Sequence, residues 1–231
     1  MFHVVYSPEW FYGKDIVIDI VSILVLLLVS FFSIRFYKIN KNRNNLYLTA
    51  SFLSLALSFA FKVLMNFKIY YSNIETQVIG TMTLSYNVIE SSNLLIFLGS
   101  LLYRALALIG LYILYSLYKK QSTSDYILVT ILLIGITYFS YSSYYVLHVI
   151  SLVLLTLIIV QYLKNYIDKS HMSTITMTLS LGLIFFSQVL FMLIGLNSDL
   201  YVAAEITQLI GYIGILVTLL MVLFNGKKNK N

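Results

Sequence analysis

Residues 15–43 read DIVIDIVSILVLLLVSFFSIRFYKINKNR, and the pattern of this stretch recurs along the whole chain. The first part, residues 15–36, is apolar over a length that crosses a bilayer as an α-helix, which needs about 20 mostly apolar residues. The second part is a short connection that carries Lys38, Lys41 and Arg43. An apolar helix followed by a short basic connection is typical of a helix that reaches the cytoplasm at its C-terminal end.

Apolar segments of spanning length occur seven times and predict an all-α integral membrane protein, a seven-transmembrane-helix bundle. They cover residues 15–36, 45–66, 92–118, 125–141, 144–163, 173–196 and 200–224. The fourth and fifth segments are joined by a tight turn and are expected to form a hairpin. No connection has room for a soluble domain, so we expect residues 1–231 to form a single membrane domain that ends in a basic cytoplasmic tail, 225–231.

Basic residues are distributed unevenly between the connections, and this predicts the orientation. Eleven lie in alternate connections and the C-terminal tail: Arg35, Lys38, Lys41, Arg43, Lys119, Lys120, Lys164, Lys169, Lys227, Lys228 and Lys230. Only Lys14 and Lys68 lie in the segments between them. Because Lys and Arg collect in cytoplasmic loops, we expect a multi-pass protein of the cell membrane with its N-terminus outside and its C-terminus in the cytoplasm.

Composition excludes several classes of protein. The chain is 60% hydrophobic and 10% charged, whereas a soluble domain carries about 25% charged residues. The net charge of +6 does not indicate nucleic-acid binding, because the basic residues sit where membrane topology alone requires them. Cysteine is absent, which excludes disulfides, thiolate metal sites and iron–sulfur clusters. No cofactor is predicted.

The connection over residues 67–91 differs from the other connections in composition. Its segment ETQVIGTMTLSYNVIE, residues 75–90, contains β-branched residues, partial alternation and a central glycine. These features predict a short β-hairpin that covers the outer end of the bundle. An irregular loop fits the same residues equally well.

Polar residues recur at helical spacing on several segments and must face the bundle interior, since lipid cannot solvate them. Ionisable groups inside a membrane are costly, about 2.5–3.5 kcal/mol each on insertion scales, so they are candidate functional groups. Most lie in the outer half, and Arg104 lies near mid-membrane, which predicts an outward-facing cup with Arg104 as its floor. The candidate ligand-binding residues are Asp19, Lys62, Asn93, Arg104, His148, Gln188, Glu205 and Gln208.

Structural roles compete with ligand binding at these positions. Stripes of Ser and Thr commonly hold helices together, and Lys62 can reach the interface by snorkelling if it lies near a helix end. Arg104 is too deep for that and needs an anion. A carboxylate of Asp19, Glu205 or Glu90, or an anionic ligand, could provide it, and both alternatives remain open.

Known catalytic arrangements find little support in the sequence. The last segment holds no lysine for a retinal Schiff base. Of the three histidines, His3 and His171 fall on opposite sides of the membrane, so His148 is left alone and a zinc or bis-His haem site is disfavoured. No GxSxG motif is present. These observations argue against an enzyme.

Three functions remain. The first is a sensor or receptor-like module that binds a small polar or anionic ligand in the outward-facing cup and signals through a cytoplasmic or membrane protein partner. The second is a non-catalytic structural subunit of a larger membrane complex, in which the polar network has no ligand. The third is a transporter or channel, which is disfavoured because there are no internal repeats or proline-broken helices.

Overall fold

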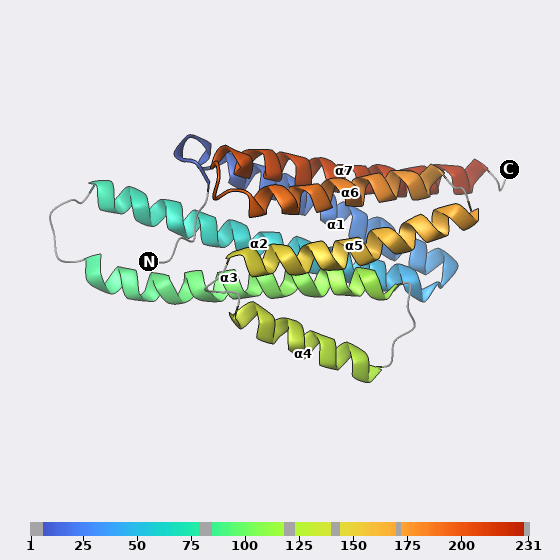
Figure 1. Cartoon of the computed structure of the whole chain (residues 1–231), viewed down its shortest axis with the longest axis horizontal. Coiled ribbons are helices and arrows are strands. Elements are labelled where there is room, and N and C mark those ends of the chain that lie inside the picture. The colour runs from blue at the N-terminus through green and yellow to red at the C-terminus, as the bar shows by residue number, and fades with distance from the viewer. Residues whose placement is uncertain (1–6, 79–84, 118–122, 140–143, 170–171, 229–231) are drawn as a thin grey trace.

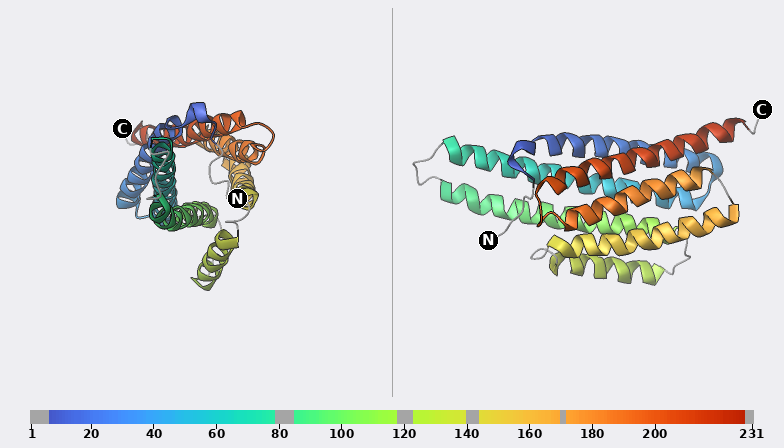
Figure 2. Two further views of the ribbon diagram at one scale, coloured as in Figure 1. Left: turned by 90° about the vertical axis from the view of Figure 1, so that its left-hand side faces the viewer. Right: turned by 45° about the horizontal axis from the view of Figure 1, so that its top comes forward.

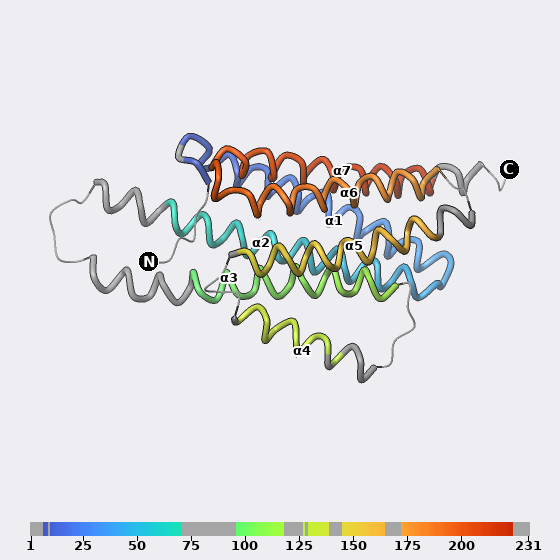
Figure 3. Tube along the Cα trace, in the orientation of Figure 1, coloured from blue at the N-terminus to red at the C-terminus, as the bar shows by residue number. Residues whose placement is uncertain are grey.

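The protein is a bundle of long helices, as Figure 1 and the trace in Figure 3 show for a computed structural model that describes residues 7–78, 85–117, 123–139, 144–169 and 172–228. A short 3-10 helix, η1 (Glu9–Phe11), precedes seven α-helices. They are α1 (Lys14–Asn40), α2 (Arg43–Val78), α3 (Ser85–Ser116), α4 (Thr123–Phe139), α5 (Tyr144–Lys169), α6 (Met172–Met192) and α7 (Asp199–Lys228). The described residues contain no strand.

Six of these helices are long and apolar enough to cross a membrane, which identifies a multi-pass helical membrane protein. Their spanning parts are Lys14–Asn40, Arg43–Tyr70, Ile96–Ser116, Tyr145–Lys164, Met172–Met192 and Asp199–Leu223. Helix α4 is the exception, since its described apolar part covers only Val129–Tyr138. All seven predicted segments are therefore helical, and the fourth is the shortest, as expected.

The expected β-hairpin between the second and third segments is not found among the described residues. Helix α2 continues to Val78 and α3 begins at Ser85, so most of the predicted strand residues are helical; residues 79–84 lie outside the described part. A two-stranded hairpin alone is marginally stable in water. A helix that continues beyond the membrane keeps its backbone hydrogen bonds within one segment, and this explains the difference.

Six helices form a closed ring. Neighbours pack in the order α1, α2, α3, α5, α6 and α7, and α7 returns to α1. The end-on view in Figure 2 shows this ring, with α4 projecting outside it. Helix α4 packs mainly against α3, where Leu133 meets Leu108 and Tyr112. The expected pairing of the fourth helix with the fifth is thus secondary to its contact with the third.

Small residues bring neighbouring helices of the ring close together. Ser51 and Ser54 on α2 donate hydrogen bonds of 2.8 Å to the backbone oxygens of Gly110 and Leu106 on α3. On α7, a side chain at Gly211 would meet Ile184 and the backbone of Ser180 on α6. Side-chain hydrogen bonds and glycine contacts of this kind replace the hydrophobic effect as the cause of helix association in lipid.

The half of the ring toward the C-terminal end of α1 is filled by apolar side chains. Leu26, Phe52, Leu155, Leu181 and Ile215 are almost completely buried in one cluster, to which all six helices of the ring contribute. Many other large apolar side chains point outward on every helix. This outward surface needs lipid, and the buried charged and amide side chains lie in the other half of the ring.

Candidate functional site

Three charged side chains from three helices meet inside the ring and form a buried ion triad. The ammonium of Lys62 on α2 lies 2.9 Å from Oδ1 of Asp19 on α1 and 2.5 Å from Oε1 of Glu205 on α7. The exposed fractions are 0% for Asp19, 7% for Lys62 and 1% for Glu205. Both carboxylates therefore share one ammonium in a space that excludes solvent.

The order of the helices explains why these residues meet. Helix α1 lies between α2 and α7 in the ring, so a polar face on α1 can contact both. The apolar spanning part of α2 ends at Tyr70, roughly two turns beyond Lys62. Lys62 is nevertheless buried, and pairing with Asp19 and Glu205 takes the place of snorkelling.

Aromatic rings surround the ammonium group. Its nitrogen lies 5.5 Å from the ring centroid of Phe59 and 5.9 Å from that of Tyr201. Ring faces attract a cation, and the effect is larger where water is excluded. Phe59 also makes an edge contact with Tyr212, at 5.6 Å between centroids. The aromatic rings connect the triad to the cavity that lies beside it.

The N-terminal segment covers the triad at the end of the bundle where α1 and α7 begin. Phe11 is buried and makes an edge contact with Tyr201, which in turn packs on Phe191. Nearby, the hydroxyl of Tyr70 donates a hydrogen bond to Asp15. The predicted cup is thus covered at its charged residues, because the triad lies below a layer of aromatic side chains.

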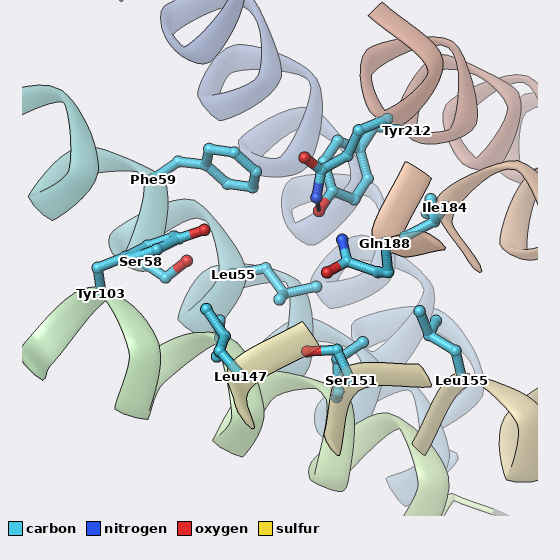
Figure 4. A pocket seen from close by; sticks show the side chains of 13 residues that line it. Leu55, Ser58, Phe59, Tyr103, Leu147, Ser151, Leu155, Ile184, Gln188 and Tyr212 are labelled. Carbon is cyan, nitrogen blue, oxygen red and sulfur yellow. Dashed lines mark hydrogen bonds between the residues drawn. The ribbon is translucent and has the colours of Figure 1, made fainter. Parts of the chain in front are cut away.

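A cavity lies at the centre of the ring, next to the triad (Figure 4). It is small, with a volume of about 30 Å³, and lies between five helices. All described lining side chains are uncharged: Leu55, Ser58, Phe59, Tyr103, Ala107, Leu111, Leu147, Ser151, Leu155, Ile184, Gln188, Gln208 and Tyr212. Six of these side chains carry a hydroxyl or amide group, so the cavity offers both hydrogen-bond donors and acceptors.

Two side chains show how the polar wall is arranged. The Gln208 amide donates a hydrogen bond of 3.1 Å to the Tyr212 hydroxyl. The Ser58 hydroxyl is buried and has no hydrogen-bond partner among the described residues. A buried hydroxyl without a partner costs free energy. A bound molecule in the cavity could satisfy it.

His148 on α5 contacts the cavity-lining residue Gln188. Its Nδ1 lies 2.8 Å from Oε1 of Gln188 on α6, and its ring stacks on Phe191 at 5.2 Å. The contact holds the Gln188 amide in place, and Figure 4 shows this amide pointing into the cavity. His148 itself is not a lining residue in the described site and acts on it through Gln188.

The structure brings together most of the residues predicted for the site. Asp19, Lys62 and Glu205 form the triad, while Gln188 and Gln208 line the cavity. Arg104 is half-buried on α3, adjacent in sequence to the lining residue Tyr103. The side chains of Asn93 and Glu90 lie outside the described residues.

Lys62 occupies the role that the sequence suggested for Arg104 toward two of its three proposed partners. Both Asp19 and Glu205 bind the Lys62 ammonium. Depth in the membrane was the reason to expect Arg104 as the central cation, because the predicted span 45–66 puts Lys62 near a helix end. Lys62 is buried and contacts both carboxylates, which makes it an interior cation.

Three aromatic side chains of the site were missed by the sequence reasoning: Phe59, Tyr103 and Tyr201. A signal was present, since Phe59 precedes Lys62 by three residues and Tyr201 precedes Glu205 by four. Residues at these spacings are neighbours on a helix surface. Aromatic residues are so common in this chain that the spacing did not stand out.

No protein-family model, curated protein or solved structure matches this chain. Among the described residues, no three His, Asp or Glu side chains cluster in a way that could hold a metal ion. The geometry itself is therefore the basis for a functional proposal. It combines a hydrogen-bonding cavity with a buried ion triad at its side.

Proposed function

We propose that the protein is a receptor-like sensor of the cell membrane, with its N-terminus outside, which binds a small uncharged polar molecule in the central cavity and signals through a protein partner. The observation that carries the proposal is the uncharged, hydrogen-bonding lining of the cavity, including the unpartnered Ser58 hydroxyl. Ligand sites are mostly apolar, with a few placed polar groups that fix orientation. Leu55, Leu155 and Ile184 supply the apolar part here.

The ligand class is revised from the sequence expectation of a polar or anionic molecule. An anion needs a cation that is available to it, and the ammonium of Lys62 is already bound to two carboxylates. The described lining contains no charged side chain. An uncharged molecule with donors and acceptors suits Ser58, Gln188 and Gln208 better than a phosphate or carboxylate does.

Signalling through the ring follows from the number of helices that the cavity touches. Its lining comes from α2, α3, α5, α6 and α7. A ligand that contacts all five helices can favour one arrangement of the ring over another by its difference in affinity. The C-terminal ends of α1, α3 and α5 lie at the end of the bundle opposite the triad (Figure 1), and the basic residues that follow them in sequence would transmit this change to a partner.

The transporter alternative finds less support. Below the cavity, the large apolar cluster around Phe52, Leu155 and Ile158 fills the described part of the ring. A path for a polar substrate or an ion would have to cross this cluster. The complex-subunit alternative is favoured by one feature, the position of α4 outside the ring with Ile127, Ile131 and Leu132 exposed.

Native mass spectrometry of the protein, gently extracted from its own membrane, tests the proposal. We expect a stoichiometric small-molecule adduct. Ala107 lines the cavity, so Ala107→Leu should fill the space and abolish the adduct without removing a polar group. Ala203 is exposed on the outer surface of α7, so Ala203→Leu adds the same volume away from the site and should leave the adduct unchanged.

The outcomes separate the alternatives. An adduct that both alanine variants retain would place any ligand outside the cavity. Defined protein partners with no adduct would favour the complex subunit instead. The mass of the adduct identifies the ligand class and thereby tests whether it is uncharged.

A further inference from the structure

The ion triad carries an imbalance of charge. Two carboxylates, Asp19 and Glu205, contact one ammonium, Lys62, and all three side chains are at least nine-tenths buried. With every group ionised, the triad has a net charge of −1 inside the membrane-spanning part of the protein. An uncompensated charge there is strongly disfavoured.

We propose that the triad is a proton-binding site, in which Asp19 carries the proton on Oδ2. Asp19 takes the proton from hydronium in the solvent: one O–H bond of hydronium breaks as the Oδ2–H bond forms, a water molecule is left, and the carboxylate becomes a neutral carboxyl group. The triad then holds one ammonium, one carboxylate and one neutral acid. This inference goes beyond the proposed function and is independent of it, because it requires no ligand in the cavity.

The hydrogen bonds identify Asp19 as the carrier. Its Oδ1 accepts from Lys62, but its Oδ2 is buried and has no hydrogen-bond partner among the described residues. Leaving an oxygen of an ionised carboxylate bare costs more than leaving a neutral one bare. Glu205 also contacts the ammonium, and neither of its carboxyl oxygens is buried without a hydrogen-bond partner among the described residues. The proton is therefore assigned to Asp19.

The neighbouring groups are consistent with this assignment. On α1, Asp15 accepts hydrogen bonds from Tyr70 and from the backbone of Ile16. It also lies in the first turn of its helix, where a negative charge is favourable. Asp15 thus has a hydrogen-bond donor at each of its carboxyl oxygens, unlike Asp19.

The helices packed on α1 supply few other charges near Asp19. Helix α2 contributes Lys62, and α7 contributes Glu205 and the neutral phenol of Tyr201. On α3, Tyr103 lies near the triad, and Arg104 follows it in sequence. Arg104 is the other cation of this region, so its effect is included in the test.

Infrared spectroscopy of the full-length protein in lipid membranes at neutral pH tests the proposal. A protonated carboxyl gives a carbonyl stretch that is separate from the carboxylate bands and moves in heavy water. We expect this band in the natural protein. We also expect it to shift when the aspartate side-chain carboxyls carry carbon-13, and to be absent in Asp19→Asn.

Three further variants serve as controls for this test. Asp15→Asn, one helical turn away, should retain the band, and Arg104→Gln should retain it as well. Asp19→Asn leaves a balanced Lys62–Glu205 pair, so the variant is expected to fold, and a thermal unfolding scan checks this. Glu205→Gln should remove the band, because Asp19 then becomes the only anion beside Lys62.

Three results would overturn the proposal. A natural protein without the band, or one whose band ignores aspartate labelling, would show that Asp19 holds no proton. A band that persists in Asp19→Asn would place the proton elsewhere. Loss of the band in Asp15→Asn with the band unchanged in Asp19→Asn would assign it to Asp15.

Discussion

At the scale of single residues, the buried lysine determines whether the bundle can hold two carboxylates in its interior. Lys62 compensates Glu205 and Asp19, and neither carboxylate is solvated. Removing one partner of a buried pair leaves the other charge without compensation, at a cost of about 3–5 kcal/mol. The contribution of Lys62 is therefore best measured from the stability of a variant that lacks its ammonium group.

Lys62→Met should lower the free energy of unfolding by about 3–5 kcal/mol, because the buried Glu205 side chain loses the cation that it contacts. Denaturant unfolding in detergent or lipid measures this. Lys38→Met is the matched control, since Lys38 is exposed near the end of α1, and it should change stability little. Adding Glu205→Gln to Lys62→Met should recover most of the loss. If it recovers nothing, the ion pair is not the cause.

Asp15 gives a second prediction at the same scale. The Tyr70 hydroxyl donates to Asp15, while Tyr12 contacts Tyr70 through its ring, stacked at 4.7 Å. A hydrogen bond to a charged group contributes about 1.5–3 kcal/mol. Tyr70→Phe should therefore lower stability by about that amount, and Tyr12→Phe, which keeps the stacked ring, should not. Equal effects in thermal unfolding would contradict the role of the Tyr70 hydroxyl.

Sequence periodicity predicted the residues of the site better than their partners. Helical spacing placed Asp19, Lys62 and Glu205 on inward faces, because each had polar neighbours one turn away. The pairing of these side chains depends on which helices are adjacent, and a single sequence does not show the order of the helices in the bundle. Arg104 was expected to be the central cation because of its depth in the membrane. That depth was estimated from predicted helix ends, which differ from the helix ends in the structure.

At the scale of helices, close packing between α6 and α7 depends on glycine. A methyl group added at Gly211 would lie 2.6 Å from Cγ1 of Ile184 and 3.0 Å from the backbone oxygen of Ser180. Backbone atoms cannot move aside without separating the helices. Nothing lies within 4 Å of the same position at Gly182 on α6.

Gly211→Ala should therefore destabilise the protein by about 1–3 kcal/mol, the usual cost of overpacking. Gly182→Ala should be neutral or slightly stabilising, since alanine is the better helix former. Thermal unfolding of the two variants under the same conditions checks the prediction. A Gly211→Ala variant as stable as Gly182→Ala would mean that α6 and α7 are not held this closely.

Helix existence was predictable and helix length was not. Apolar runs identified all seven helices because each run is long and uninterrupted. The ends were harder to predict where a helix leaves the membrane, as at α2, whose last residues are polar. In that part, hydropathy no longer reports secondary structure, and β-branched residues suggested strands that the described chain does not form.

At the scale of the whole molecule, the ring explains where polar and apolar residues are placed. Charged and amide side chains occupy the interior of one half, and apolar side chains fill the other. Large apolar side chains are exposed on all seven helices, which suits lipid. The order of the ring, with α3 beside α5 and α4 outside, was not evident from connection lengths. It depends on which helix faces fit together.

Orientation is the remaining prediction at this scale, and the absence of cysteine makes it directly testable. Asn197 lies between α6 and α7, Asn42 lies between α1 and α2, and both are exposed. Figure 1 shows these connections at opposite ends of the bundle. The distribution of basic residues predicts that Asn197 faces outward and Asn42 faces the cytoplasm.

In intact cells, a membrane-impermeant maleimide should therefore label Asn197→Cys and spare Asn42→Cys. Lysis should expose Asn42→Cys to the reagent, which controls for its reactivity. The reverse pattern would turn the bundle over and place the end covered by Phe11 in the cytoplasm. The cavity would then sample molecules of the cell interior, and the basic connections would face outward, so the direction of sensing depends on this one result.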